Sequence, residues 1–141
     1  MKSQQSGSRV MQSAGAVLAG LLAIVVLSIA TDMVMHLTGV FPPMSQPMPD
    51  PMFLLPTSYR VVIGVLGGYL SARLAPYRPM THAMVLGCIG VAVSIAGAVA
   101  TWNAGPEFGP KWYPLALVVT ALPSVWLGAK LVTRKRGTQS T

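Results

Sequence analysis

Three ionisable side chains lie within or beside long apolar segments: Asp32, His36 and Arg60. Asp32 and His36 are one helical turn apart, so both project from one face of a helix. Arg60 begins the next apolar segment and can reach Asp32 if the two segments are neighbours. Two interpretations follow. The favoured one is a structural Asp32–Arg60 ion pair with His36 as a hydrogen-bond donor, and the alternative is a site for an anion, metal or proton on a transport path.

A proline-rich loop between the first two apolar segments is the second candidate site. It carries Met44, Met48 and Met52 at steps of four. Thioether sulfur is a suitable ligand for Cu(I). The density of proline favours polyproline II, however, and its three-residue repeat turns methionines four apart away from one another. We therefore interpret the segment as a stiff loop, with a copper site as the alternative.

The other reactive groups form no catalytic pattern. The single cysteine, Cys88, excludes an intramolecular disulfide and a CxxC redox or zinc site. The sequence contains no nucleophile–base arrangement, phosphate-binding loop or metalloprotease helix. We therefore expect neither enzyme activity nor a cofactor.

The composition indicates a membrane protein. Charged residues make up 9% of the 141-residue chain, whereas soluble proteins contain roughly 25%. The net charge is +7, but the basic residues gather at the ends of apolar segments instead of forming a stripe on a polar domain. This distribution argues against nucleic acid and makes the lipid bilayer the expected partner.

Four apolar segments are long enough to cross about 30 Å of hydrocarbon. They cover about residues 14–40, 57–75, 82–102 and 112–132, and together they predict an all-α bundle over residues 14–132. Arg60 and Lys111 lie on one side of the membrane in this scheme. The other side holds eight basic residues: Lys2, Arg9, Arg73, Arg78, Lys130, Arg134, Lys135 and Arg136.

This charge asymmetry predicts that both termini are cytoplasmic. Residues 1–13 would be a cytoplasmic N-terminal segment, and residues 133–141 a basic cytoplasmic tail. Arg134, Lys135 and Arg136 in that tail are expected to contact anionic lipid headgroups.

A cleaved signal peptide is the alternative for the first segment. Lys2 and Arg9 precede an apolar stretch, and Ser28 and Ala30 are the small residues typical of a cleavage site. The apolar run continues beyond Ala30 to Leu37, and the segment before it is long and polar. We therefore predict an uncleaved first helix, whereas cleavage would leave three spans.

An internal duplication is a further hypothesis. Residues 69–74 resemble residues 126–131, and residues 28–30 match residues 94–96. Two hairpins with the same course would be parallel repeats related by an axis along the membrane normal. Chance matching in a biased composition is the alternative.

Small residues recur at steps of four in each predicted span, including Gly64, Gly68 and Ala72 in the second, and Ser124 and Gly128 in the fourth. Such ladders are typical of closely packed membrane helices. We favour this interpretation over a glycine-lined pore.

Several short motifs occur together from about Thr31 onward. They are Thr31-Asp32, His36, Tyr59-Arg60, Gly67-Gly68-Tyr69, Ala72-Arg73-Leu74-Ala75-Pro76, Arg78-Pro79-Met80, His82-Ala83 and Gly109-Pro110-Lys111-Trp112-Tyr113-Pro114. In this combination the chain resembles a group of uncharacterised small four-span bacterial membrane proteins. The resemblance implies the fold and a location in the bacterial inner membrane. It assigns a function to no residue, since the group has no established activity.

Three functional hypotheses follow. The leading one is a non-enzymatic accessory or assembly component of the inner membrane. The second is a small transporter or channel subunit that uses Asp32, His36 and Arg60. The third is a copper-handling protein with a methionine-rich loop. A second copy of this chain or another membrane protein is a possible partner in each case.

Overall fold

The structure is a computed structural model that describes residues 1–139. These residues form four long helices, each long and apolar enough to cross a membrane, which confirms the predicted all-α membrane fold. The elements in chain order are α1 (Lys2–Leu37), the 3-10 turn η1 (Asp50–Phe53), α2 (Leu54–Leu74), α3 (Pro79–Thr101), the 3-10 turn η2 (Pro106–Phe108) and α4 (Trp112–Thr138).

Two helices extend further than the predicted spans. α1 begins at Lys2, so it includes most of the predicted N-terminal segment 1–13. α4 continues to Thr138 and takes in most of the predicted tail 133–141, of which residues 140–141 lie outside the described part of the chain. A span ends where the chain stops being apolar, whereas a helix ends where backbone hydrogen bonding stops, so a helix can continue into the polar flank.

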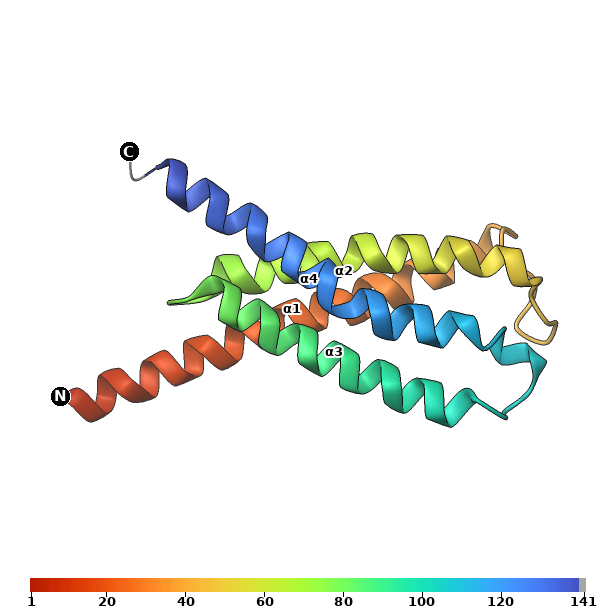
Figure 1. The fold of residues 1–141 in the computed structure, drawn as a ribbon, viewed down its shortest axis with the longest axis horizontal. Helices are drawn as coiled ribbons and strands as arrows, with labels where there is room; N and C mark the ends of the chain where they lie inside the picture. Colours follow the sequence, from red (N-terminus) through yellow and green to blue (C-terminus); the bar gives the residue numbers. More distant parts are fainter. Residues whose placement is uncertain (140–141) are drawn as a thin grey trace.

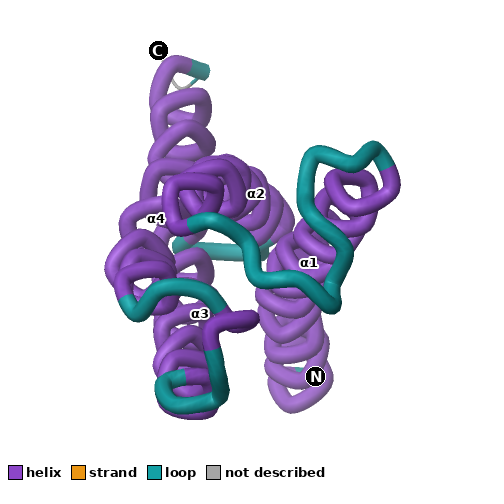
Figure 2. Tube along the Cα trace, turned by 90° about the vertical axis from the view of Figure 1, so that its right-hand side faces the viewer, coloured by secondary structure: helices purple, strands orange, loops and turns teal. Residues whose placement is uncertain are grey.

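The four helices run back and forth along one long axis (Figure 1). One end of the bundle holds both termini and the 75–78 turn, and we call it the terminal end. The other end holds the 38–53 and 102–111 segments, and we call it the loop end. α2 contacts the other three helices, and α4 packs mainly on α2 and α3. Seen from the loop end, α1 stands to one side of this group and packs chiefly on α2 (Figure 2).

Most of α1 is exposed. Ala16 and Gly20 are the buried residues in this 36-residue helix. Large apolar side chains such as Leu22, Val26 and Ile29 are 58–60% exposed. In a membrane this surface would face lipid or another protein.

Glycines bring α2 and α4 into backbone contact. A Cβ atom on Gly128 would lie 2.5 Å from the backbone nitrogen of Tyr69, and one on Gly68 would lie 2.5 Å from the Cα atom of Val125. Gly64 lies against the Ser124 side chain in the same seam. The small-residue ladders of these two helices therefore serve close packing, as the sequence predicts.

The hairpins α1–α2 and α3–α4 follow the same course from the terminal end to the loop end and back (Figure 1). This is the arrangement that a parallel repeat requires. The matched segments share a contact: a cation lies over the aromatic ring four residues before it, at 6.0 Å for Arg73 and Tyr69 and at 4.4 Å for Lys130 and Trp126. The duplication itself stays a prediction.

Phe53 joins the 38–53 segment to the 102–111 segment and to the start of α4. The ring of Phe53 lies 4.9 Å from that of Tyr113, centroid to centroid. The Phe53 ring also covers Gly109, where a Cβ atom would overlap it. Gly109 has a φ of 87°, which other residues rarely adopt. The loop end is thus a packed structure that holds the side chains around Arg60 in place.

Candidate functional site

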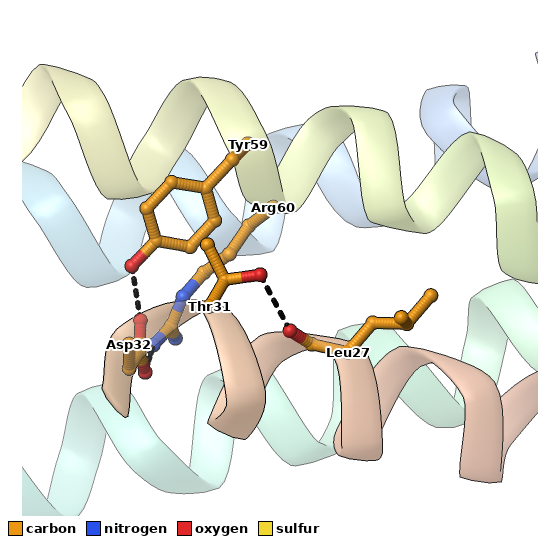
Figure 3. A network of polar contacts seen from close by, with 5 residues as sticks. All are labelled: Leu27, Thr31, Asp32, Tyr59 and Arg60. Atoms are coloured by element: carbon orange, nitrogen blue, oxygen red, sulfur yellow. Dashed lines mark hydrogen bonds and ion pairs between the residues drawn. The ribbon is translucent and has the colours of Figure 1, made fainter. Parts of the chain in front are cut away.

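The centre of the site is a hydrogen-bonded network between α1 and α2 (Figure 3). Nη2 of Arg60 donates to Oδ2 of Asp32 at 2.6 Å, and the Tyr59 hydroxyl donates to Oδ1 of the same carboxylate. The ion-pair side chains of Arg60 and Asp32 are 32% and 33% exposed. Two adjacent residues of α2 therefore engage both oxygens of a single carboxylate on α1.

Thr31 lies beside this network without joining it. Its hydroxyl donates to the backbone carbonyl of Leu27 at 2.7 Å, one turn earlier in α1 (Figure 3). This local bond satisfies the hydroxyl within its own helix. The contacts between the two helices here thus converge on Asp32.

Arg60 also faces α4. Its guanidinium carbon lies 5.9 Å from the ring centroid of Tyr113, a distance at which a cation is attracted to the face of an aromatic ring. The Nε atom of Arg60 is buried and has no hydrogen-bond partner among the described residues. Arg60 is therefore held by a carboxylate and a ring, while its buried Nε–H has no acceptor among the described residues.

His36 lies near the network and has a different partner. Its Nδ1 is 3.0 Å from the carbonyl oxygen of Pro42, so Nδ1 carries the proton in this contact. Its ring also packs edge-on against Phe41, at 5.4 Å between centroids. His36 therefore ties the start of the 38–49 loop to the end of α1.

A cavity of about 510 Å³ opens at the loop end above the ion pair. It brings the three residues of the predicted polar cluster to one surface, together with aromatic rings and loop side chains. The lining residues are Asp32, His36, Phe41, Pro42, Pro43, Met44, Gln46, Met48, Phe53, Pro56, Arg60, Glu107, Phe108 and Tyr113. We call this the loop-end cavity.

A second cavity, of about 220 Å³, lies between the four helices. Most of its lining is aliphatic, and the hydroxyl residues Ser28, Ser94, Thr120 and Ser124 are also part of it. Arg60 lines both this interhelical cavity and the loop-end cavity. The arginine is therefore placed where the two cavities approach each other.

On the terminal side of the interhelical cavity, the helices are in close contact with one another. A Cβ atom on Gly20 of α1 would lie 2.7–2.9 Å from Leu86, Ser71 and the carbonyl oxygen of Gly67. Leu86 and Ser71 are 1% and 0% exposed. α1, α2 and α3 thus touch at this level.

The methionine-rich loop is divided by the fold. Met44 and Met48 line the loop-end cavity with His36, whereas Met52 lies in η1 and is not part of that lining. The described residues contain no group of three or more His, Cys, Asp or Glu side chains suited to hold a metal ion. Methionine sulfur is not among these ligand types, so the copper site stays a prediction.

The predicted lipid-contacting residues are also separated. Lys135 and Arg136 line a cavity at the terminal end with residues of α2, and Arg134 is not part of its lining. All three side chains are exposed.

Two side chains that contact Asp32 or Arg60 are absent from the cluster predicted from the sequence. The sequence places Tyr59 only in the Tyr59-Arg60 motif, and Tyr113 only in the motif of residues 109–114. A phenol next to a membrane-embedded arginine could have indicated a second donor to Asp32. Tyr113 lies fifty-three residues after Arg60 in the sequence, so no local pattern indicates that the two side chains meet.

No protein-family model, curated protein or solved structure matches this chain. The functional argument therefore rests on the geometry of the polar network and the two cavities beside it.

Proposed function

We propose that this chain is a multi-pass protein of a bacterial inner membrane that acts by binding, as a non-enzymatic accessory or assembly component. Four helices that could span a membrane are compatible with such a location. In this proposal the loop end faces outward and the terminal end faces the cytoplasm, following the asymmetry of basic residues. The binding site is the loop-end cavity.

The composition of the loop-end cavity is the observation that carries the proposal. Aromatic rings, charged groups and loop methionines line a space of about 510 Å³ on an accessible surface. Aromatic residues and methionine are enriched where proteins bind one another, and charged groups at the edge give specificity. We infer that a segment of a membrane partner, or of a second copy of this chain, occupies the cavity.

The state of the polar network supports binding over catalysis. Both oxygens of Asp32 already accept hydrogen bonds, from Tyr59 and Arg60. A carboxylate engaged in this way is poorly placed to abstract a proton from a substrate. The network is better suited to hold α1 and α2 in register beneath the cavity.

Site-specific photo-crosslinking in the native membrane tests this proposal. A benzophenone amino acid would replace Phe108, which lines the cavity and is 48% exposed. The matched control replaces Val119, which is 71% exposed on α4 and lines none of the cavities described above.

We expect a discrete crosslinked product at position 108 and none of the same mass at position 119. A product twice the mass of the monomer would identify a second copy as the partner, and identical patterns at both positions would contradict the proposal.

Transport is the second candidate, and the position of Arg60 is the observation that favours it. This residue lines both cavities, and its buried Nε has no partner among the described residues. Proton and chloride flux into liposomes that contain the purified protein would test this function. Transport predicts flux above that of empty liposomes, together with its loss in a folded Asp32→Leu/Arg60→Met variant. Flux equal to the background would leave binding as the function.

A further inference from the structure

A cavity at the terminal end is lined by cations from two helices. It has a volume of about 370 Å³ and is framed by Tyr69 and Arg73 of α2 and by Val132, Lys135, Arg136 and Gln139. Nη2 of Arg136 donates to the backbone carbonyl of Arg73 at 3.3 Å. This contact brings the end of α4 over the end of α2, so that both helices contribute side chains to the same space.

Two of these cations, Arg73 and Lys135, lie close to the ring of Tyr69. Nη1 of Arg73 donates to the Tyr69 hydroxyl at 3.0 Å. The guanidinium carbon of Arg73 lies 6.0 Å from the ring centroid, and Nζ of Lys135 lies 5.8 Å from it. Because the phenolic oxygen accepts from Arg73, its own hydrogen is left to donate. The cavity therefore offers donors from a phenol, two guanidinium groups and an ammonium group.

The chain has no acidic side chain at this end to balance these charges. Its three acidic residues are Asp32, Asp50 and Glu107, and all belong to the loop-end half. Along α2, Arg73 is thirteen residues from Arg60, the arginine that pairs with Asp32, and this corresponds to about 20 Å of helix. Asp32 is already paired with Arg60 at that distance, so it does not balance the cations at the terminal end. The repulsion among the three cations is therefore left for an external anion to relieve.

The surroundings of the cavity are those of a membrane surface. Val132, which lines the cavity, is 5% exposed. Leu74 and Leu131, the chain neighbours of the lining residues Arg73 and Val132, are 51% and 48% exposed. An anion in the cavity would thus lie beside apolar side chains that face the hydrocarbon. Basic pockets between membrane helices bind phospholipid headgroups in this way.

We propose that this cavity is a defined binding site for the phosphate group of an anionic phospholipid. Arg73 and Arg136 donate to the phosphate oxygens, Lys135 adds charge, and the Tyr69 hydroxyl donates a further hydrogen bond. The hydrogen bond from Arg136 also satisfies the backbone carbonyl of Arg73. This site is narrower than general attraction of a basic tail to the membrane, because Arg134 belongs to the same tail and lies outside the cavity lining.

Arg134 and Arg136 provide a matched pair of variants. Arg136→Gln and Arg134→Gln remove the same charge two positions apart on α4, and Arg73→Gln tests the contribution of α2. The full-length protein in detergent would be titrated with phosphatidylglycerol or phosphatidylcholine, and bound lipid would be counted by native mass spectrometry. Inorganic phosphate would be titrated separately as the soluble source of the same chemistry.

We expect one phosphatidylglycerol to bind saturably, with at least tenfold preference over phosphatidylcholine. Arg136→Gln and Arg73→Gln should each weaken this binding about tenfold, and Arg134→Gln less than twofold. Equal losses for Arg134→Gln and Arg136→Gln would overturn the proposal, as would equal binding of both lipids. Binding of inorganic phosphate as tight as that of phosphatidylglycerol would reassign the site to a soluble anion.

Unfolding followed by tryptophan fluorescence establishes that each variant is folded before lipid is added. Arg73→Lys provides a second test if Arg73→Gln does not fold, because lysine keeps the charge and loses the bidentate guanidinium. We expect Arg73→Lys to bind phosphatidylglycerol more weakly than the unmodified protein. Undiminished binding would show that the geometry assigned to Arg73 is wrong.

Discussion

The Asp32–Arg60 ion pair should behave as a coupled unit. Asp32→Asn keeps a side-chain oxygen that can accept from Tyr59, but it removes the negative charge that faces Arg60. Exposed ion pairs contribute about 0.2–1 kcal/mol, and removing one partner of a buried pair costs about 3–5 kcal/mol. The side chains of this pair are 32% and 33% exposed. We therefore expect Asp32→Asn to lower the free energy of unfolding by about 1–3 kcal/mol, between these two limits.

The double variant separates pairing from general sensitivity of the site. Asp32→Leu with Arg60→Met removes both charges and fills much of the same space with apolar atoms, which is often nearly neutral when a buried pair is replaced. The double variant should therefore lose less stability than the sum of the losses in the single variants Asp32→Leu and Arg60→Met. We expect an interaction energy of about 1–2 kcal/mol, in the range measured for residues in contact.

Unfolding of the full-length protein in mixed micelles measures this interaction energy. The fraction of sodium dodecyl sulfate would be raised while the fluorescence of the three tryptophans is followed. Asp50→Asn is the control, since Asp50 is an exposed carboxylate in η1, and we expect a change below about 0.5 kcal/mol for such a surface substitution. Additive single and double variants would refute the inference that Asp32 and Arg60 stabilise each other.

Three further outcomes are expected. Gly128→Ala should destabilise the bundle by about 1–3 kcal/mol, because its Cβ atom would meet backbone atoms of α2, whereas Gly97→Ala points into open space and should cost nothing in the same unfolding assay. Tyr59→Phe should cost about 1–2 kcal/mol in that assay through loss of its hydrogen bond to a carboxylate, and an unchanged midpoint would contradict this role. A reporter enzyme fused after Arg136 should be active in the cytoplasm, and one inserted near Gln46 should be active outside. The reverse pattern would show that the predicted orientation in the membrane is wrong.

Much of the fold could be predicted from local properties of the chain. A run of about 20 apolar residues that crosses a bilayer must satisfy its own backbone hydrogen bonds, and a helix achieves this within one segment. For this reason the four helices and their approximate limits follow from apolar length and the positions of proline. The limits of α1 and α4 differ most, since helical hydrogen bonding continues into polar flanks where an apolar run has already ended.

The side chains that meet could not be predicted in the same way. The spacing of Asp32 and His36 places both on one face of α1, but it does not determine which helix lies opposite or at what height. Those quantities depend on how closely the backbones approach, which here is governed by glycine contacts between α1, α2 and α4.

As a result, only the tertiary structure showed that Tyr59 donates to Asp32 while His36 binds the carbonyl of Pro42. It also placed Arg136 over Arg73, sixty-three residues away in the chain, and left the neighbouring Arg134 outside that cavity. Sequence spacing specifies which face of a helix a residue occupies, whereas packing between helices decides which faces come together.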